Sequence, residues 1–245
     1  MTALDIFKEC YKNVPDQGEV GHSPATYIMA AATILSPNDA GYEAVREAAI
    51  ALVEGRNPYG LALNKKLDRG TLLRLCQDEA VDPMAAFCCC MAWGSQWSVK
   101  GGFDNFSGAL GNASKLTEAL SRLKHGEFIT RKAAFEYLSD KKAGGISGLG
   151  PSFYTKLIFF FEARKPNRSL GYIWDSRVKA SYEKLKSCFP EFKMSYQHGD
   201  GQAGRYEDYC RFVDCLTLKM GWADGSATEV ALFGNSADWR SYLNR

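Results

Sequence analysis

A short glycine-rich turn between two helical patterns constrains the fold of this chain more than any other feature. Residues 144–150 are Gly-Gly-Ile-Ser-Gly-Leu-Gly, and Pro151 follows directly. Two glycines around one apolar residue, Gly148 and Gly150, allow a tight turn with positive φ and a backbone that approaches a ligand closely. Pro151 stands where a helix begins, because its missing N–H is not needed at the first helical position. The pattern therefore predicts a glycine hairpin that leads into a helix.

The surroundings of this hairpin suit a phosphate group. Upstream, residues 131–138 carry apolar side chains at helical spacing, so the unit is expected to be helix, hairpin, helix. The free N–H groups at the start of the second helix, with the partial positive charge of that helix end, favour an anion. Such a seat holds a nucleic-acid backbone without reading its sequence. We expect the DNA-backbone contacts to come from Gly148, Leu149, Gly150 and Ser152.

This pattern resembles the helix-hairpin-helix motif of base-excision DNA glycosylases. An acid, Asp175, follows 25 positions after Gly150, on a short apolar lead-in at residues 172–174. The sequence around Lys156 and residues 172–175 is similar to that of a prokaryotic group of 8-oxoguanine DNA glycosylases. The resemblance covers residues 120–185 best and the rest more loosely.

The resemblance implies an all-α, two-lobed fold. One lobe, residues 41–170, would end in the helix-hairpin-helix, and residues 1–40 plus 171–245 would form the second. The cleft between the lobes would hold a base that has been extruded from the duplex. Double-stranded DNA with a damaged or modified base is the implied partner, and we expect a monomer in the cytoplasm, at the nucleoid.

The same resemblance makes Asp175 the catalytic acid. Breaking an N-glycosidic bond builds positive charge on the sugar, and a carboxylate beside C1′ stabilises that charge. An aspartate directly before Ser176 is also a common helix N-cap, and the two roles are compatible. In bifunctional relatives the catalytic lysine lies two positions after the second hairpin glycine, and here that position is Ser152. Lys156, one helical turn further, is the candidate amine nucleophile; the alternative is a helix-surface lysine that contacts phosphate.

A flipped base is held by stacking and by edge hydrogen bonds, and the chain is rich in aromatic residues. Most of these are expected in the core. Trp93, Trp174 and Phe153 are the candidates for the base pocket.

Apolar spacing predicts helices and no strands. The expected helices cover residues 4–11, 25–35, 42–54, 71–76, 84–93, 116–123, 131–138, 178–188, 206–220 and 226–233, and one more that begins at Pro151. The helix at 84–93 is apolar on every side and is expected at the centre. Residues 101–112, rich in glycine and asparagine, and the polar stretch 190–205 are expected to be loops.

Composition narrows the function classes further. The net charge is only +2, but residues 122–186 hold 14 Lys and Arg against 6 Asp and Glu, which is the footprint of a polyanion binder. No run of 18 apolar residues exists, and no secretory leader is expected. The eight cysteines are expected to be reduced, and the consecutive Cys88 to Cys90 to be buried in a helix, because adjacent thiolates cannot surround one tetrahedral ion.

No cofactor is expected. Only three cysteines follow Asp175, whereas some relatives of the superfamily carry four clustered there for an iron–sulfur cluster. Whether the hairpin binds a monovalent cation is left open. The three histidines have no Ser or Cys partner at a recognisable spacing, so a hydrolase triad is not indicated.

Together with the resemblance, these observations predict a DNA glycosylase. The resemblance alone implies that it removes an oxidised purine such as 8-oxoguanine, with abasic-site lyase activity through a lysine Schiff base. Two alternatives stay open. One is a monofunctional glycosylase for another damaged or modified base, including one in phage DNA. The other is a DNA-binding protein in which the hairpin grips the backbone and Asp175 is only a helix cap.

Overall fold

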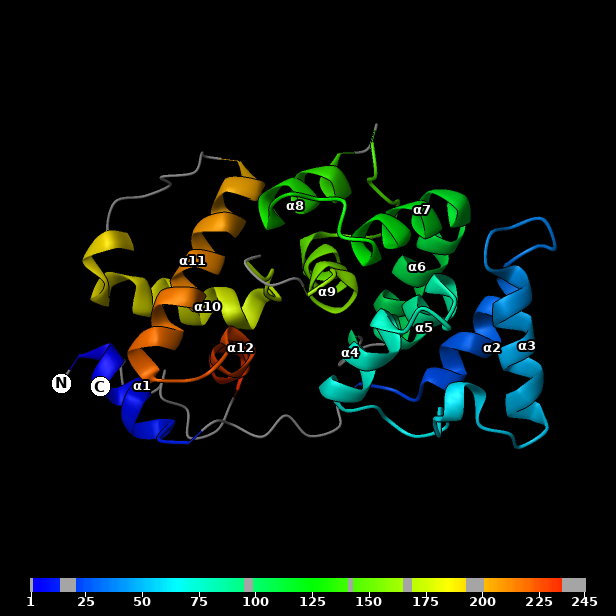
Figure 1. Ribbon diagram of the computed structural model, residues 1–245, viewed down its shortest axis with the longest axis horizontal. Helices are drawn as coiled ribbons and strands as arrows, with labels where there is room; N and C mark the ends of the chain where they lie inside the picture. The colour runs from blue at the N-terminus through cyan, green and yellow to red at the C-terminus, as the bar shows by residue number, and fades with distance from the viewer. Residues whose placement is uncertain are drawn as a thin grey trace. The chain divides into compact units, whose positions relative to one another are not determined.

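The computed structural model shows an all-helical protein (Figure 1). It describes residues 2–13, 21–94, 99–140, 143–164, 169–192 and 201–234, without the side chains of residues 99–103 and 191. Within these ranges there are twelve α-helices and no strand, so the predicted fold class is confirmed. None of the described helices has the length and apolar character needed to cross a membrane.

The chain divides into two compact units, and each is described by itself. The middle unit is Gly18–Arg168. Its helices are α2 (Pro24–Ile34), α3 (Tyr42–Val53), α4 (Arg69–Gln77), α5 (Pro83–Gly94), α6 (Val99–Leu110), α7 (Ala113–Lys124), α8 (Arg131–Ser139) and α9 (Pro151–Phe161), with a short 3-10 helix η1 (Pro58–Gly60). The other unit, which we call the terminal unit, joins Met1–Gln17 to Ser169–Arg245. It contains α1 (Ala3–Cys10), α10 (Ser176–Leu185), α11 (Gln202–Met220) and α12 (Gly225–Phe233), with the 3-10 helices η2 (Lys186–Cys188) and η3 (Pro190–Phe192).

Helix α5 is the core of the middle unit, as its apolar sequence predicts. Every side chain from Met84 to Ala92 is buried, and α2, α3, α4, α7 and α9 all pack against it. The predicted start is also present, because the Asp82 carboxylate accepts a 2.8 Å hydrogen bond from the Met84 N–H and Pro83 is the first helical residue. The central cysteines, Cys88 to Cys90, are buried and reduced, as expected.

The two units do not follow the ranges that the resemblance implied. Residues 18–40, which we expected with the terminal half of the chain, group with the middle unit. The physical reason lies in α2, which packs along α3 and α5. Its Tyr27 is 3% exposed and makes an edge contact with Phe106 of α6.

The expectation of a loop at residues 101–112 is wrong. Helix α6 runs through most of this stretch despite glycines at 101, 102 and 108. The intrinsic cost of glycine in a helix is about 1 kcal/mol per residue, and burial of side chains offsets it. Phe106, Ala109 and Leu110 are all buried, and Phe106 also stacks on Phe87 of α5.

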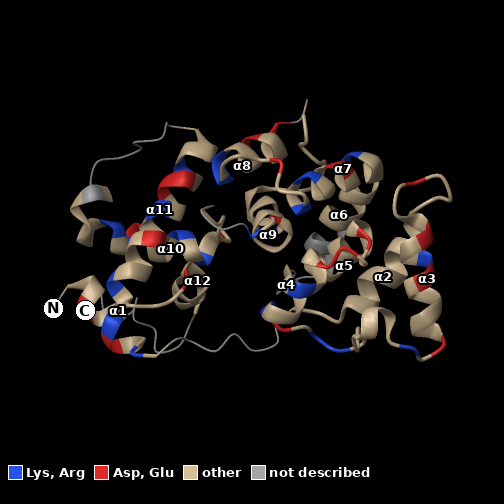
Figure 2. Cartoon of the chain, viewed as in Figure 1, with Lys and Arg blue, Asp and Glu red and all other residues tan. Residues whose placement is uncertain are grey.

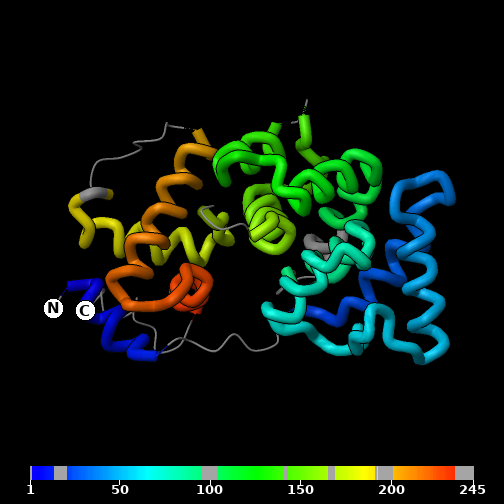
Figure 3. The backbone as a smooth tube through the Cα atoms, viewed as in Figure 1, coloured from blue at the N-terminus to red at the C-terminus, as the bar shows by residue number. Residues whose placement is uncertain are grey.

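In the terminal unit, α10 packs against α1 and α12, and α12 packs against α11 (Figure 3). Two buried hydrogen bonds join these helices. The Ser181 hydroxyl donates to the Leu232 carbonyl at 2.6 Å, and the hydroxyls of Thr217 and Thr228 lie 2.7 Å apart. The loop expected at 190–205 is shorter than predicted, because η3 begins it and α11 starts at Gln202. Residues 193–200 between them, and the tail 235–245, lie outside the described residues.

Candidate active site

The glycine hairpin joins α8 to α9, as the sequence predicts. Only one of its two expected positive-φ glycines has that conformation. Gly148 has φ +84°, whereas Gly150 has φ −113° and is the N-cap of α9, directly before Pro151. The turn therefore needs glycine at position 148 for its backbone, but not at position 150. Gly150 also has open space around it, since an added β-carbon would meet nothing within 4 Å.

Helix α6 packs against the hairpin, a contact that the sequence did not suggest. A β-carbon added at Gly148 would lie 2.8 Å from the Asn105 carbonyl oxygen, and one added at Gly108 would lie 3.4 Å from the Gly148 Cα. The two backbones therefore approach more closely than side chains would allow. Gly108 thus allows the close approach of the hairpin, although glycine weakens α6 as a helix.

The start of α9 offers free donors. Within the described part of the chain, the N–H groups of Gly150 and Ser152 have no hydrogen-bond partner, while those of Phe153 and Tyr154 donate to the Gly150 carbonyl at 2.8 and 3.0 Å. Leu149 is only 6% exposed, and its N–H donates to the Ile146 carbonyl at 3.3 Å, so this residue adds no free donor. Two N–H groups beside a helix start form the anion seat that the pattern indicates.

Lys156 lies on the buried side of α9, one turn after Ser152. It is 7% exposed, and its Nζ donates to the Ser152 Oγ at 3.1 Å. The ammonium also lies 5.1 Å from the centre of the Phe153 ring. This lysine is therefore not the exposed helix-surface residue of the alternative interpretation.

The end of α5 leaves room for the Lys156 side chain. A β-carbon at Gly94 would lie 3.0 Å from the Lys156 Cδ and 3.3 Å from its Cε, so a larger residue would press on the stem of this lysine. The nearby Cys90 thiol is 1% exposed, and burial raises its pKa to about 12 despite the positive charge of Lys156. Cys90 is thus a neutral wall of the lysine site rather than a second nucleophile.

Asp175 caps α10 with one carboxylate oxygen, and the other oxygen is left for another ligand. Its Oδ1 accepts hydrogen bonds from the N–H groups of Arg177 and Val178, both at 2.9 Å. Its Oδ2 accepts no hydrogen bond from the described residues, and Asp175 is half-buried. The cap that the sequence predicts is present, and it holds the carboxylate in a fixed orientation.

The apolar lead-in anchors Asp175 to the terminal unit. The Tyr172 hydroxyl donates to Asp214 Oδ1 at 2.8 Å, and the Tyr209 hydroxyl donates to the Ile173 carbonyl at 2.9 Å. A β-carbon at Gly225 would lie 2.2 Å from the Tyr172 hydroxyl, so α12 approaches this ring with backbone alone. These contacts fix the backbone directly before the acid.

The three base-pocket candidates have different surroundings. The Trp174 ring is stacked with Tyr209, with centroids 6.2 Å apart, and it also lies 6.0 Å from the Tyr206 ring centre and 4.2 Å from the Lys179 ammonium. These contacts make Trp174 a packed residue rather than an open stacking platform. Trp93 is half-buried, and its Nε1 is buried without a hydrogen-bond partner among the described residues. Phe153 is half-buried beside Lys156.

Lys156, Phe153, the hairpin and Trp93 belong to the middle unit, whereas Asp175 and Trp174 belong to the terminal unit. The predicted site residues thus form two groups. Each group has its own supporting contacts, and each is described separately.

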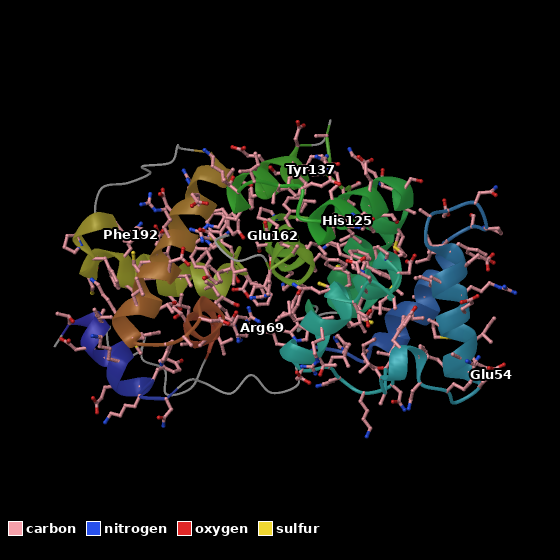
Figure 4. All side chains as sticks on the ribbon, in the orientation of Figure 1. Glu54, Arg69, His125, Tyr137, Glu162 and Phe192 are labelled. Atoms are coloured by element: carbon pink, nitrogen blue, oxygen red, sulfur yellow. The ribbon has the colours of Figure 1, made fainter. Side chains whose placement is uncertain are left out.

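Figure 2 marks the Lys and Arg residues of the chain in blue. Those of the basic segment are less available to a polyanion than its composition suggests. Lys124 is 8% exposed, and its Nζ donates to the carbonyls of Asp78 at 2.6 Å and Val81 at 3.1 Å. Arg131 is 2% exposed. Outside the segment, Arg69 is also buried; its guanidinium lies 3.9 Å from the Phe159 ring centre (Figure 4). Several cations therefore serve the core, and a charge count overstates the DNA-binding surface.

Lys179 is the residue near the site that sequence reasoning missed. It lies one helical turn after Asp175, and burial lowers its pKa while the negative charge of Asp175 raises it in part. The i to i+4 spacing from Asp175 was the available signal. Among the described residues, no group of three or more His, Cys, Asp or Glu side chains could hold a metal ion.

Comparison with known proteins gives one match. Residues 39–233 match the model of the family described as "Putative 8-oxoguanine DNA glycosylase OGG-like protein". No curated protein and no solved structure matches the chain. The matched region contains the hairpin, Lys156 and Asp175, and it covers most of the sequence. The chain belongs to this OGG-like DNA glycosylase family.

Proposed function

We propose that this protein excises 8-oxoguanine from double-stranded DNA and cleaves the abasic strand through a Schiff base on Lys156. The observation that carries the proposal is the buried amine of Lys156, held 3.1 Å from Ser152 Oγ at the first turn of the helix that follows the glycine hairpin. An amine placed beside an anion seat is close to a DNA backbone whenever that seat is occupied.

The chemistry begins with the neutral amine. Nζ attacks C1′ of the flipped nucleotide and forms a C–N bond, while the N-glycosidic bond breaks and its electron pair leaves with the base, which takes up a proton. The new amine loses a proton, its lone pair forms a C=N bond to C1′, and the C1′–O4′ bond breaks as O4′ takes up a proton. The sugar ring is thereby opened to a protonated Schiff base. Loss of a C2′ proton then expels the 3′-phosphate by β-elimination, which cuts the strand.

Asp175 is proposed to stabilise the positive charge that develops on the sugar as the base leaves. Its Oδ1 is engaged by two backbone N–H groups, so the carboxylate is preorganised and its second oxygen can face the substrate. The hairpin N–H groups are proposed to hold a backbone phosphate, and no cofactor takes part in these steps.

The test is a base-release assay on two duplexes that differ only by one 8-oxoguanine. The expected result is release of 8-oxoguanine, with strand cleavage that does not require alkali, and no release from the undamaged duplex. Release of 8-oxoguanine with cleavage only after alkali would make the enzyme monofunctional. Absence of release from lesion duplexes, with DNA binding intact, would favour the non-catalytic alternative.

A further inference from the structure

The terminal unit contains a pocket of about 260 Å³ that neither the hairpin nor Asp175 accounts for. Its lining comes from the lead-in, α10 and the first turn of α11, namely Trp174, Lys179, Tyr182, Glu183, Gln202 and Arg205. A water molecule occupies about 30 Å³, so the pocket holds a phosphate group together with several waters.

The charges around this pocket favour an anion. Lys179 and Arg205 are its two cations. Among the described lining residues Glu183 is the one acid, and it forms an ion pair with Lys186 on the next turn. The described lining therefore has two cations against one acid, a net charge of +1.

Lys179 is the lining residue whose charged form an anion would stabilise most. Its ammonium lies 4.2 Å from the Trp174 ring centre, and burial lowers its pKa. The Trp174 ring is covered by this ammonium and by its stack with Tyr209, so it is closed to a nucleobase. The pocket therefore suits a compact anion better than a planar base.

We propose that this pocket binds a phosphate of the DNA backbone, with Lys179 and Arg205 as its cationic partners and Gln202 as a neutral donor. Lys179 also interacts electrostatically with Asp175, one turn earlier. A phosphate in the pocket is thus coupled through Lys179 to the acid, and it positions the strand without reading its sequence. This inference rests on the proposed function, because it takes DNA as the ligand.

The first test measures the affinity for an undamaged duplex by fluorescence anisotropy between 50 and about 200 mM salt. Lys179→Gln is expected to weaken binding several-fold and to lower the magnitude of the log–log salt slope by about 0.9, the value for one phosphate. Arg205→Gln is expected to act similarly, and Lys179→Arg to retain most of the affinity. Lys8→Gln, an exposed lysine of the same unit that does not line the pocket, is the matched control and should behave like the parent. Circular dichroism verifies that each variant is folded.

The second test locates the phosphate and separates its sources. Single neutral methylphosphonates are placed along each strand. At one position the substitution is expected to weaken DNA binding by the parent but not by Lys179→Gln, because the phosphate and Lys179 form the same contact. An unchanged salt slope in both folded variants, Lys179→Gln and Arg205→Gln, overturns the proposal. A second outcome also overturns it: inorganic phosphate protects the parent from thermal unfolding, Lys179→Gln loses this protection, and the DNA affinity of the two proteins is the same. The pocket would then be a site for free anions.

The base-release assay separates this inference from the proposed function. Failure of the parent to release 8-oxoguanine contradicts the proposed reaction and leaves the methylphosphonate result to decide the pocket. Release by the parent, with no methylphosphonate position sensitive to Lys179, contradicts the pocket alone.

Discussion

The Lys156 ammonium lies 3.1 Å from the Ser152 hydroxyl, one turn back along the same helix. In bifunctional glycosylases that the chain resembles, the position of Ser152 carries the catalytic lysine. The longer reach of Lys156 thus brings an amine to the hydroxyl of the residue that occupies the standard position. Side chains on a helix lean toward its N-terminus, which is why a lysine four residues later can do this.

Replacing the amine should abolish the covalent step. Lys156→Gln removes the nucleophile, so borohydride reduction with an 8-oxoguanine duplex should give no trapped protein–DNA adduct, whereas the parent gives one. Lys65→Gln, an exposed lysine of the same unit, should trap like the parent. An adduct that persists in folded Lys156→Gln would assign the nucleophile to a different amine.

Removing the charge of Asp175 should slow chemistry more than binding. Asp175→Asn retains an oxygen that can cap α10, so the free energy of unfolding should change by less than about 1 kcal/mol. Loss of one preorganised electrostatic contact typically slows catalysis by about 100-fold or more. Single-turnover base release should fall by that order while the Kd for lesion DNA stays near that of the parent. A fall of only a few-fold would show that the residue is a cap and nothing more.

The two hairpin glycines should separate stability from DNA binding. Gly148→Val forces a β-branched residue into a left-handed conformation and toward the Asn105 carbonyl, which should cost at least about 1–2 kcal/mol of stability. The β-carbon of Gly150→Val would meet no protein atom within 4 Å, so this variant should lose less stability than Gly148→Val, about the cost of a poorer helix N-cap. Its side chain would stand beside the free N–H groups, so affinity for damaged and undamaged duplexes should fall alike. Full affinity in Gly150→Val would remove the hairpin as the phosphate seat.

Binding should depend on salt, but less than the composition suggests. Two proposed phosphate seats give a log–log slope of magnitude about 1.8 or more, at about 0.9 per phosphate. The buried cations Lys124 and Arg131 should add nothing, because they serve the core. Titration of an undamaged duplex at several salt concentrations measures this slope, and a value near zero would contradict DNA as the ligand.

The cysteines should divide into two reactivity classes. Burial raises the pKa of the Cys76 and Cys88 to Cys90 thiols, and Cys210 is buried as well. Cys10, Cys188 and Cys215 are half-buried. A disulfide reagent should therefore modify at most three thiols in the native protein and all eight after denaturation. Rapid modification of more than three in the native state would contradict the burial of the thiols on α4, α5 and α11.

Local signals in the sequence were enough for the elements that carry strong patterns. The apolar run of α5, the Asp82-Pro83 start and the Asp175 cap depend on neighbours within a few residues, and all three are present. The start of α9 at Pro151 and the positive φ of Gly148 also follow from local signals, whereas the positive φ expected at Gly150 is not present. Where the pattern and the structure agree, the deciding interactions are short-range.

Where packing decided the outcome, the sequence was misleading. Helix α6 has too many glycines for its propensity, and the burial of its side chains, above all Phe106 against Tyr27 and Phe87, offsets this cost. The count of basic residues likewise could not reveal that Lys124 turns inward to two carbonyls. The sequence also could not show that Lys156 is buried, because this burial depends on packing against α5, which no spacing within α9 encodes.

The connectivity of the terminal unit has a consequence for synthesis on the ribosome. Helix α1 belongs to a unit whose other helices begin only at Ser176, and it packs against α10. Its Phe7 is fully buried. The middle unit can complete its core as soon as residue 168 has emerged, since domains tend to fold as units during translation. The first helix must stay unpaired until the last part of the chain arrives, so closing this long-range contact is expected to be the late, slow event in folding.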